Sequence, residues 1–344
     1  MTFNNDTQQQ LVIAIHHLVV DVISWSVLLN DLMTLLDDSS ATLPAKTVSQ
    51  QDWNNALLQH ADSSQVLSQK DYWLAMARSV AGSEVKGTEH EHAGRVSDAA
   101  ITQQSAKVDL TEQLLNDANS AFNTEPWHLL LAALTLASHK QTTLTSPIVN
   151  LETHGRDPIP ESDITEPGRT VGWFTATCPF PLNNEQAEIG DLIKDVKERV
   201  RRMPGNGRDF GLLRWLSSQL STSEQQQLAS IQPNIGFNYL GLLDGNQQVQ
   251  PLDRSLTTSP QLEQTLPLDL VLFVRDEQLT IELMYDTKRI NTHQADTLLN
   301  DYLQALSDIT AFCSGQQHTE KTATDFTVTE LEQDEFDDIL DDIF

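Results

Sequence analysis

A continuous apolar run, Leu11–Ile15, is the first ordered element that the sequence predicts, and it leads directly into His16-His17. A run without alternation is typical of a strand that is buried on both faces of a sheet. Such a strand needs neighbouring strands on each side, yet only ten residues, most of them polar, precede it. We therefore expect its neighbours to come from later in the chain or from outside it.

The hydrophobic period changes after Asp21. Apolar residues then recur at steps of three and four, as in an amphipathic helix; they are Val22, Trp25, Leu28, Leu29, Leu32, Leu35 and Leu36. The same kind of pattern predicts further helices over about 53–81, 111–122, 127–140, 189–202, 210–220 and 291–312. Strands are expected near 105–110, 147–151, 170–181, 235–240, 268–274 and 279–285.

Polar stretches divide the chain into parts. Residues 82–104 are interpreted as a linker between a first part, 1–81, and a second part, 105–313, and residues 314–329 form another polar linker. The final segment, 330–344, has eight acidic residues among fifteen and no basic one. Its apolar residues fall at helical spacing; they are Phe336, Ile339, Leu340, Ile343 and Phe344. This pattern predicts either a solubilising end or a motif that folds on a partner.

Composition excludes several classes of function. Hydrophobic residues make up 39% and charged residues 20%, as in soluble globular proteins. The net charge of −28 argues against nucleic acid and membrane surfaces as partners. Two cysteines, Cys178 and Cys313, are too few for a disulfide framework or a cysteine-based zinc site. No window reaches the ~20 apolar residues of a membrane span, and the polar start lacks the features of a signal peptide. A cytoplasmic location is therefore expected.

His16-His17 stands where the predicted strand gives way to the helix, with Asp21 four residues further on. Side chains at such a junction project from rigid elements toward a cleft, which suits a catalytic base. Neighbouring residues of a strand point to opposite faces, so only one of the two histidines can face a given cleft. No third ligand at helical spacing supports a zinc site.

The histidine motif and four later stretches together resemble a known family. In chain order the stretches are His16–Leu29, Leu151–Asp157, Arg169–Thr175, Pro204–Arg214 and Phe237–Gly241. They resemble the motifs of the epimerization branch of the condensation-domain superfamily of nonribosomal peptide synthetases, relatives of chloramphenicol acetyltransferase. The resemblance covers about residues 11–313. It departs at Val22 and Thr153, where small residues are usual, and at Cys178, where an aromatic residue is usual.

The resemblance implies an α/β (α+β) fold, the two-lobed architecture of chloramphenicol acetyltransferase. Family members carry much of the N-terminal lobe before the histidine motif, so residues 1–81 are expected to be the remainder of an incomplete lobe. The implied reaction removes and returns the α-proton of an aminoacyl or peptidyl thioester. The partner is a peptidyl carrier protein, which supplies the substrate on its 4′-phosphopantetheine arm; the domain itself is expected to bind no cofactor and no metal.

Residue roles follow from the same resemblance. His17 and Glu152 are expected to be the two catalytic acid/base groups, meeting in the cleft between the lobes. Asp21 is expected to pair with an arginine and fix the loop, and His16 to be a buried support. The remaining supporting residues are expected to hold the loops, line a substrate tunnel or donate hydrogen bonds; they are Ser24, Trp25, His154, Arg156, Trp173, Asn238 and Tyr239. For Trp173, core packing is an equally good interpretation.

Two surface features remain open. Basic residues gather around the glycine-rich turn and are either a solvated helix face or a contact for an acidic carrier protein or the pantetheine phosphate; they are Lys194, Lys197, Arg199, Arg201, Arg202, Arg208 and Arg214. Residues 330–344 resemble the docking segments with which synthetase subunits bind the next subunit. The alternatives to epimerization are peptide-bond formation by a condensation domain, or an inactive remnant that acts through its docking tail.

Overall fold

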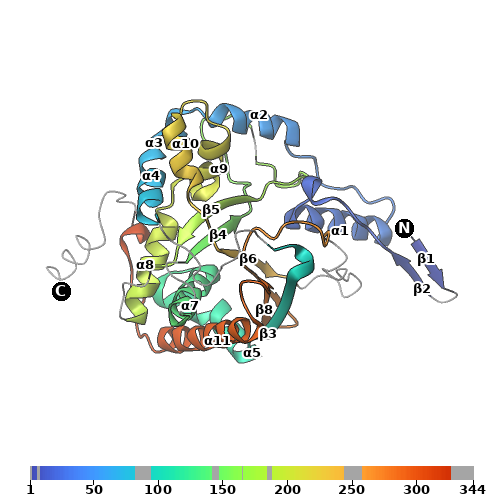
Figure 1. Cartoon of the computed structure of the whole chain (residues 1–344). Coiled ribbons are helices and arrows are strands. Elements are labelled where there is room, and N and C mark those ends of the chain that lie inside the picture. Colours follow the sequence, from blue (N-terminus) through green and yellow to red (C-terminus); the bar gives the residue numbers. More distant parts are fainter. Residues whose placement is uncertain are drawn as a thin grey trace.

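The computed structural model describes residues 2–5, 8–81, 94–141, 147–164, 166–183, 188–243 and 258–326. A mixed sheet forms its centre (Figure 1), with the strand order β3-β8-β7-β6-β4-β5. The strands are β3 (Ala99–Ser105), β4 (Ile148–Thr153), β5 (Ala176–Pro181), β6 (Ile235–Leu242), β7 (Leu268–Arg275) and β8 (Gln278–Asp286). β6 runs parallel to both β4 and β7, and the other pairs are antiparallel.

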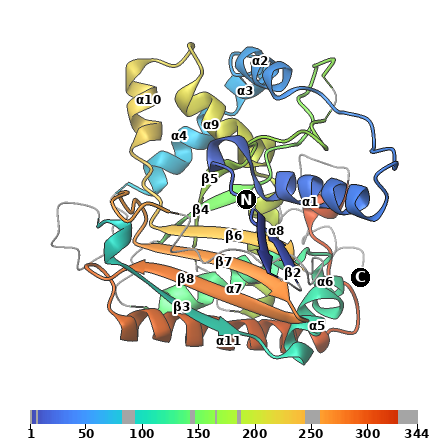
Figure 2. The same ribbon diagram turned by 90° about the vertical axis from the view of Figure 1, so that its right-hand side faces the viewer.

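One face of this sheet carries the main hydrophobic core. Along β7 buried and half-buried residues alternate without a break, as the two-residue period of a strand requires. Helices α7 (Pro126–Lys140) and α11 (Thr292–Ser314) lie along this face (Figure 2), and Tyr302 of α11 is completely buried there. Around them lie α5 (Val108–Leu115), α6 (Asp117–Phe122) and α8 (Ile189–Arg201). The opposite face is left for the candidate site.

A second group of helices lies above β4 and β5 (Figure 1). It comprises α2 (Gln50–His60), α3 (Ser64–Ser68), α4 (Lys70–Ser79), α9 (Arg208–Trp215) and α10 (Thr222–Ala229). The single helix predicted over 53–81 is thus three shorter helices. The serine caps Ser49 and Ser63 start α2 and α3 by accepting backbone hydrogen bonds.

The predicted buried strand at Leu11–Ile15 is wrong. Strand β2 (Gln8–Leu11) ends where that run begins, and it pairs only with β1 (Thr2–Asn5) in a separate two-stranded sheet. Residues 12–16 belong to no helix or strand, and Leu11 is 51% exposed. A doubly buried strand needs neighbours on both sides, and the described part of the chain provides none here.

Several other boundaries differ from the prediction. The strand expected near 105–110 lies earlier, as β3, and α5 begins at Val108 instead. Residues 99–104 therefore belong to the sheet rather than to the predicted linker 82–104, of which 82–93 lie outside the described residues. The strand expected over 170–181 is confirmed only from Ala176, and the helix expected over 210–220 is α9, which ends at Trp215. The predicted tail 330–344 also lies outside the described residues.

The basic cluster predicted near the glycine-rich turn is largely paired with carboxylates. Lys197 of α8 is completely buried, and its Nζ donates to Asp325 and, at 2.6 Å, to the carbonyl of Phe122. Burial opposes ionisation of Asp325, but hydrogen bonds from Lys197, the Thr322 backbone and Arg201 lower its pKa to about 2. This buried pair joins the predicted linker 314–329 to α8, so Lys197 is on neither a solvated face nor a carrier-binding surface.

The helix that follows the histidine motif is confirmed as α1 (Val22–Asp37). Its apolar residues are only partly covered, and Ser24 is its one fully buried residue. Among the described residues, no helix is long and apolar enough to cross a membrane.

Candidate active site

A buried ion pair joins the start of α1 to the loop after β4. Asp21 caps α1 by accepting from the Ser24 backbone N–H at 2.7 Å. Its two carboxylate oxygens also accept from Nη2 of Arg156 at 2.8 and 2.9 Å. Burial raises the pKa of Asp21, but the hydrogen bonds from Ser24 and Arg156 outweigh this effect and the net pKa is lowered. The arginine partner expected for Asp21 is therefore Arg156.

The loop Arg169–Thr175 is held by the same two residues at the start of α1, Asp21 and Ser24. The Ser24 hydroxyl donates to the carbonyl of Gly172 at 2.9 Å and accepts from its N–H at 3.0 Å. The N–H of Phe174 donates to Asp21 at 3.2 Å, and the Arg156 guanidinium lies 4.1 Å from the centre of the Phe174 ring. Two segments far apart in the sequence are thereby fixed to each other through buried groups.

Gly155 allows the two loops to approach this closely. Its φ is +64°, a conformation that favours glycine. A Cβ at this position would stand only 1.8 Å from the carbonyl oxygen of Phe174. The Glu-Thr-His-Gly-Arg stretch at the end of β4 therefore needs glycine for a steric reason.

The two histidines are both exposed. The His17 ring contacts Trp173, with the ring centres 5.2 Å apart, so the fixed loop supports the candidate base. His16 was predicted to be a buried support, and this is wrong: it lies at the surface, where its Nδ1 accepts from the Leu18 N–H at 3.2 Å. The reason is that the histidines start the short 3₁₀ turn His17–Val19, not the end of a buried strand.

Glu152 lies in β4 on the sheet face that the main core leaves uncovered. Asn238 Nδ2, from the neighbouring strand β6, donates to Glu152 Oε2 at 2.5 Å. Tyr239 follows Asn238 in the strand and so points to the opposite face, where it packs on the main core. Of the two residues predicted to donate near the substrate, only Asn238 shares a face with Glu152.

The other supporting residues lie at the edges of this arrangement. The His154 side chain is 54% exposed; its Nδ1 accepts from the Arg156 N–H at 3.0 Å and its Nε2 lies 3.9 Å from Asp157. Trp25 is half-buried in α1. Trp173 is 44% exposed, which agrees with a role in lining a cleft better than with core packing.

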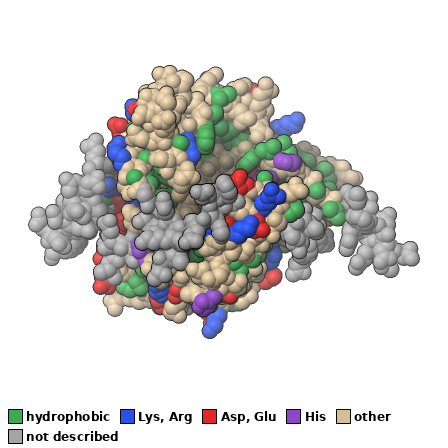
Figure 3. Space-filling view, in the orientation of Figure 1, with side chains coloured by type: hydrophobic (Ala, Val, Ile, Leu, Met, Phe, Trp, Pro, Cys, Tyr) green, Lys and Arg blue, Asp and Glu red, His purple; other side chains and the backbone are tan. Residues whose placement is uncertain are grey.

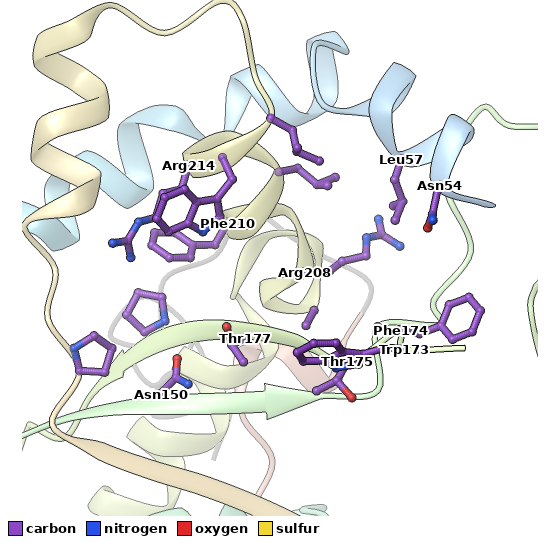
Figure 4. Close-up of a pocket in the computed structure, with 18 of the residues that line it drawn as sticks. Asn54, Leu57, Asn150, Trp173, Phe174, Thr175, Thr177, Arg208, Phe210 and Arg214 are labelled. Atoms are coloured by element: carbon purple, nitrogen blue, oxygen red, sulfur yellow. The ribbon is translucent and has the colours of Figure 1, made fainter. Parts of the chain in front are cut away.

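A cavity of about 490 Å³ lies beside these residues, between the sheet and α9 (Figure 4). Figure 3 shows a hollow with apolar side chains beside it on this side of the molecule. The walls include Trp173 of the fixed loop, Asn150 and Thr177 of the sheet, and Phe210 and Arg214 of α9. Sequence reasoning missed Asn150, although a two-residue step along β4 places it on the same face as Glu152.

In the described ranges, no three His, Cys, Asp or Glu side chains are placed to hold a metal ion together. The titratable groups are instead arranged as one carboxylate, Glu152, on an open sheet face and one imidazole, His17, on a supported turn. A carboxylate and an imidazole are both side chains that can exchange protons with a substrate.

The family model for the condensation domain matches residues 1–332, so the chain belongs to the condensation-domain family of enzymes. It is 32% identical to tyrocidine synthase 1 of Brevibacillus parabrevis and 34% identical to tyrocidine synthase 2 of that organism, in each case over 96% of this chain. The chain spans 32% and 9% of those two proteins.

Solved structures agree with this assignment. The epimerization domain from the third module of tyrocidine synthetase B has a TM-score of 0.79 and 31% identity, covering 88% of this chain and 69% of that one. The SgcC5 protein from Streptomyces globisporus, at 16% identity and a TM-score of 0.63, shares the fold; the match covers 88% of this chain and 69% of that one. The predicted condensation-domain superfamily and the α/β (α+β) fold class are thus confirmed.

Proposed function

We propose that the protein is an epimerization domain of a nonribosomal peptide synthetase. Its substrate is an aminoacyl or peptidyl thioester on the 4′-phosphopantetheine arm of a peptidyl carrier protein. The observation that carries the proposal is the Glu152 carboxylate, which Asn238 holds at 2.5 Å on the open face of the sheet. The similarity to a solved epimerization domain at 31% identity supports it.

The reaction needs one proton acceptor on each side of the α-carbon. One group takes the α-proton, and the electron pair of the broken C–H bond enters an enolate of the thioester. The other group then delivers a proton to the opposite face, which leaves the inverted centre and no net change in atoms or charge. Glu152 and His17 take these two roles, and their protonation states are exchanged at the end of each turnover.

The test is loss of an isotope from the α-carbon. A carrier-bound aminoacyl thioester labelled with deuterium at Cα should lose the label to water when the protein is added, and the D- and L-forms should both appear. Mass spectrometry and chiral chromatography of the hydrolysed residue measure the two results. Retention of the label together with formation of a new peptide bond would instead identify a condensation domain, the activity that the family's name describes.

We also propose that residues 330–344 bind the next synthetase subunit. The support is the apolar stripe on an acidic segment, with eight acidic residues among fifteen. Affinity should be modest and should weaken with salt, because exposed charge pairs are screened.

Deleting residues 330–344 should leave α-proton exchange unchanged and should reduce peptide transfer to the downstream subunit. The two rates can be measured in one reaction with purified subunits at low micromolar concentrations. The best control is a full-length variant in which serine replaces Ile343 and Phe344. It removes part of the apolar stripe and retains the negative charge of the segment. Equal transfer by the intact and the deleted proteins would show that the segment only aids solubility.

A further inference from the structure

One arginine of the cavity lacks a carboxylate partner among the described residues. Arg214 of α9 makes a single long hydrogen bond, from Nη2 to the carbonyl of Ala229 at 3.5 Å, and its buried Nε has no acceptor in the described part of the chain. Arg208, in the same cavity wall, differs because it bonds Asp209 at 3.0 Å and the Asp157 carbonyl at 2.8 Å. Burial lowers the pKa of Arg214, yet an arginine stays charged at neutral pH. A partly desolvated cation is therefore available to a ligand.

Two aromatic side chains of α9 lie beside the Arg214 guanidinium. Its guanidinium lies 4.5 Å from the centre of the Trp215 ring and 6.0 Å from that of Phe210. Figure 4 shows Phe210 and Arg214 on the same side of α9, above the strands that carry Asn150 and Thr177. An aromatic ring stacks on the plane of a guanidinium and leaves the N–H groups at its edge free to donate. This arrangement favours bidentate binding of a carboxylate or phosphate.

The same cavity borders residues that neighbour the candidate catalytic groups, although neither Glu152 nor His17 lines it. Asn150 precedes Glu152 by two residues on one face of β4, and Thr177 lies directly opposite Glu152 in β5. Trp173, which contacts His17, also lines the cavity. A volume of about 490 Å³ lies within the range of ligand-binding pockets, so a ligand that contacts Arg214 has room to extend along Asn150 and Thr177 toward Glu152.

We propose that Arg214 binds an anionic oxygen group of the substrate while the reacting α-carbon lies beside Glu152. The identity of the substrate rests on the proposed function; the anion site rests on Arg214 and the cavity. Two parts of a carrier-bound thioester have this chemistry. One is a side-chain carboxylate of the aminoacyl or peptidyl group, and the other is the phosphate of the pantetheine arm.

Calorimetric titration of the whole protein distinguishes these sources. The phosphate probe is 4′-phosphopantetheine, compared with dephosphorylated pantetheine. The carboxylate probe is the N-acetylcysteamine thioester of N-acetylglutamate, compared with its neutral glutamine analogue. Each probe is titrated into the wild type, Arg214→Gln and Arg275→Gln. Arg275 is a matched control because it also lies over an aromatic ring, 4.9 Å from the centre of Phe273, and does not line the cavity.

For at least one anionic probe, Arg214→Gln should weaken binding about tenfold or more, the usual effect of losing a hydrogen bond to a charged group. The neutral analogues and the Arg275→Gln variant should show no such loss. A loss confined to phosphopantetheine identifies the phosphate as the ligand, and a loss confined to the glutamyl probe identifies the carboxylate. Equal binding of both anionic probes to the wild type and Arg214→Gln would overturn the proposal, as would no preference of the wild type for either anion.

Two features keep this test decisive. Arg214→Met keeps an unbranched apolar side chain beside Trp215 and replaces Arg214→Gln if the latter melts early. Binding is measured without turnover, so a protein that binds the anion through Arg214 but does not exchange the α-proton would refute epimerization and retain the anion site. A protein that exchanges the α-proton but does not bind the anion through Arg214 would refute the anion site alone.

Discussion

Replacing Glu152 by glutamine should lower the rate of α-proton exchange by about 10²–10⁴-fold, the usual effect of losing a positioned acid or base. Glutamine keeps the size of the side chain and can still accept from Asn238, so the sheet should remain intact. Only the ability to take up and release a proton is lost. Exchange is measured as loss of deuterium from the α-carbon of a carrier-bound aminoacyl thioester.

Glu282→Gln is the matched control for this substitution. Glu282 lies in β8 on the same face of the sheet, in register with Val271, which is in turn in register with Asn238. The Glu282→Gln substitution removes an equal charge from the same face at a residue that does not line the cavity, so its exchange rate should equal that of the wild type. His17→Ala should resemble Glu152→Gln. If Glu152→Gln exchanged as fast as Glu282→Gln, the assignment of Glu152 as an acid/base group would be wrong.

Much of this arrangement could be predicted from local pattern. The helix after the histidine motif and the strands β7 and β8 follow directly from hydrophobic period, and the structure confirms them. The two-residue period of a strand also bears on the supporting residues of β6. Because neighbouring residues of a strand face opposite ways, Asn238 and Tyr239 could not both face one substrate.

Other features depend on contacts that no local pattern contains. Asp21 and Arg156 are 135 positions apart, so the identity of the arginine partner becomes visible only once the fold brings the two loops together. Lys197 lies in α8, and the many charged residues of that helix predict an exposed side chain. In the folded protein Lys197 is buried instead, paired with Asp325 from a distant segment. The exposed position of His16 likewise depends on a tertiary property, because residues 12–15 have no strand paired with them in the described part of the chain.

The second large effect is expected at the Asp21–Arg156 pair, whose side chains are 4% and 5% exposed. Asp21→Asn should lower the free energy of unfolding by roughly 3–5 kcal/mol, the usual cost of leaving one member of a buried ion pair without its partner. Asparagine is as good a helix cap as aspartate, so the loss reports the pair rather than the cap of α1. Thermal or urea melts of both proteins measure the difference.

Asp31→Asn provides the comparison for a partly exposed pair. Asp31 accepts from Arg169 at 2.7 Å, but the two side chains are 27% and 29% exposed. A pair of this kind contributes about 0–1 kcal/mol, so Asp31→Asn should melt close to the wild type. Equal melting of Asp21→Asn and Asp31→Asn would contradict the role of the buried pair in holding the loops together.

The dependence of this effect on pH follows from the lowered pKa of Asp21. An aspartate whose pKa is lower in the folded than in the unfolded protein stabilises the fold at pH values above its unfolded pKa of 3.8. The stability difference between the wild type and Asp21→Asn should therefore be constant near neutral pH. It should shrink as the pH falls below about 4, because the unfolded state then takes up the proton first, and it is lost once the pH passes below the lowered pKa of the folded state, where the carboxylate is protonated in both states. Since the same pair holds the loop that supports His17 through Trp173, α-proton exchange by Asp21→Asn should also fall at temperatures where the variant is still folded.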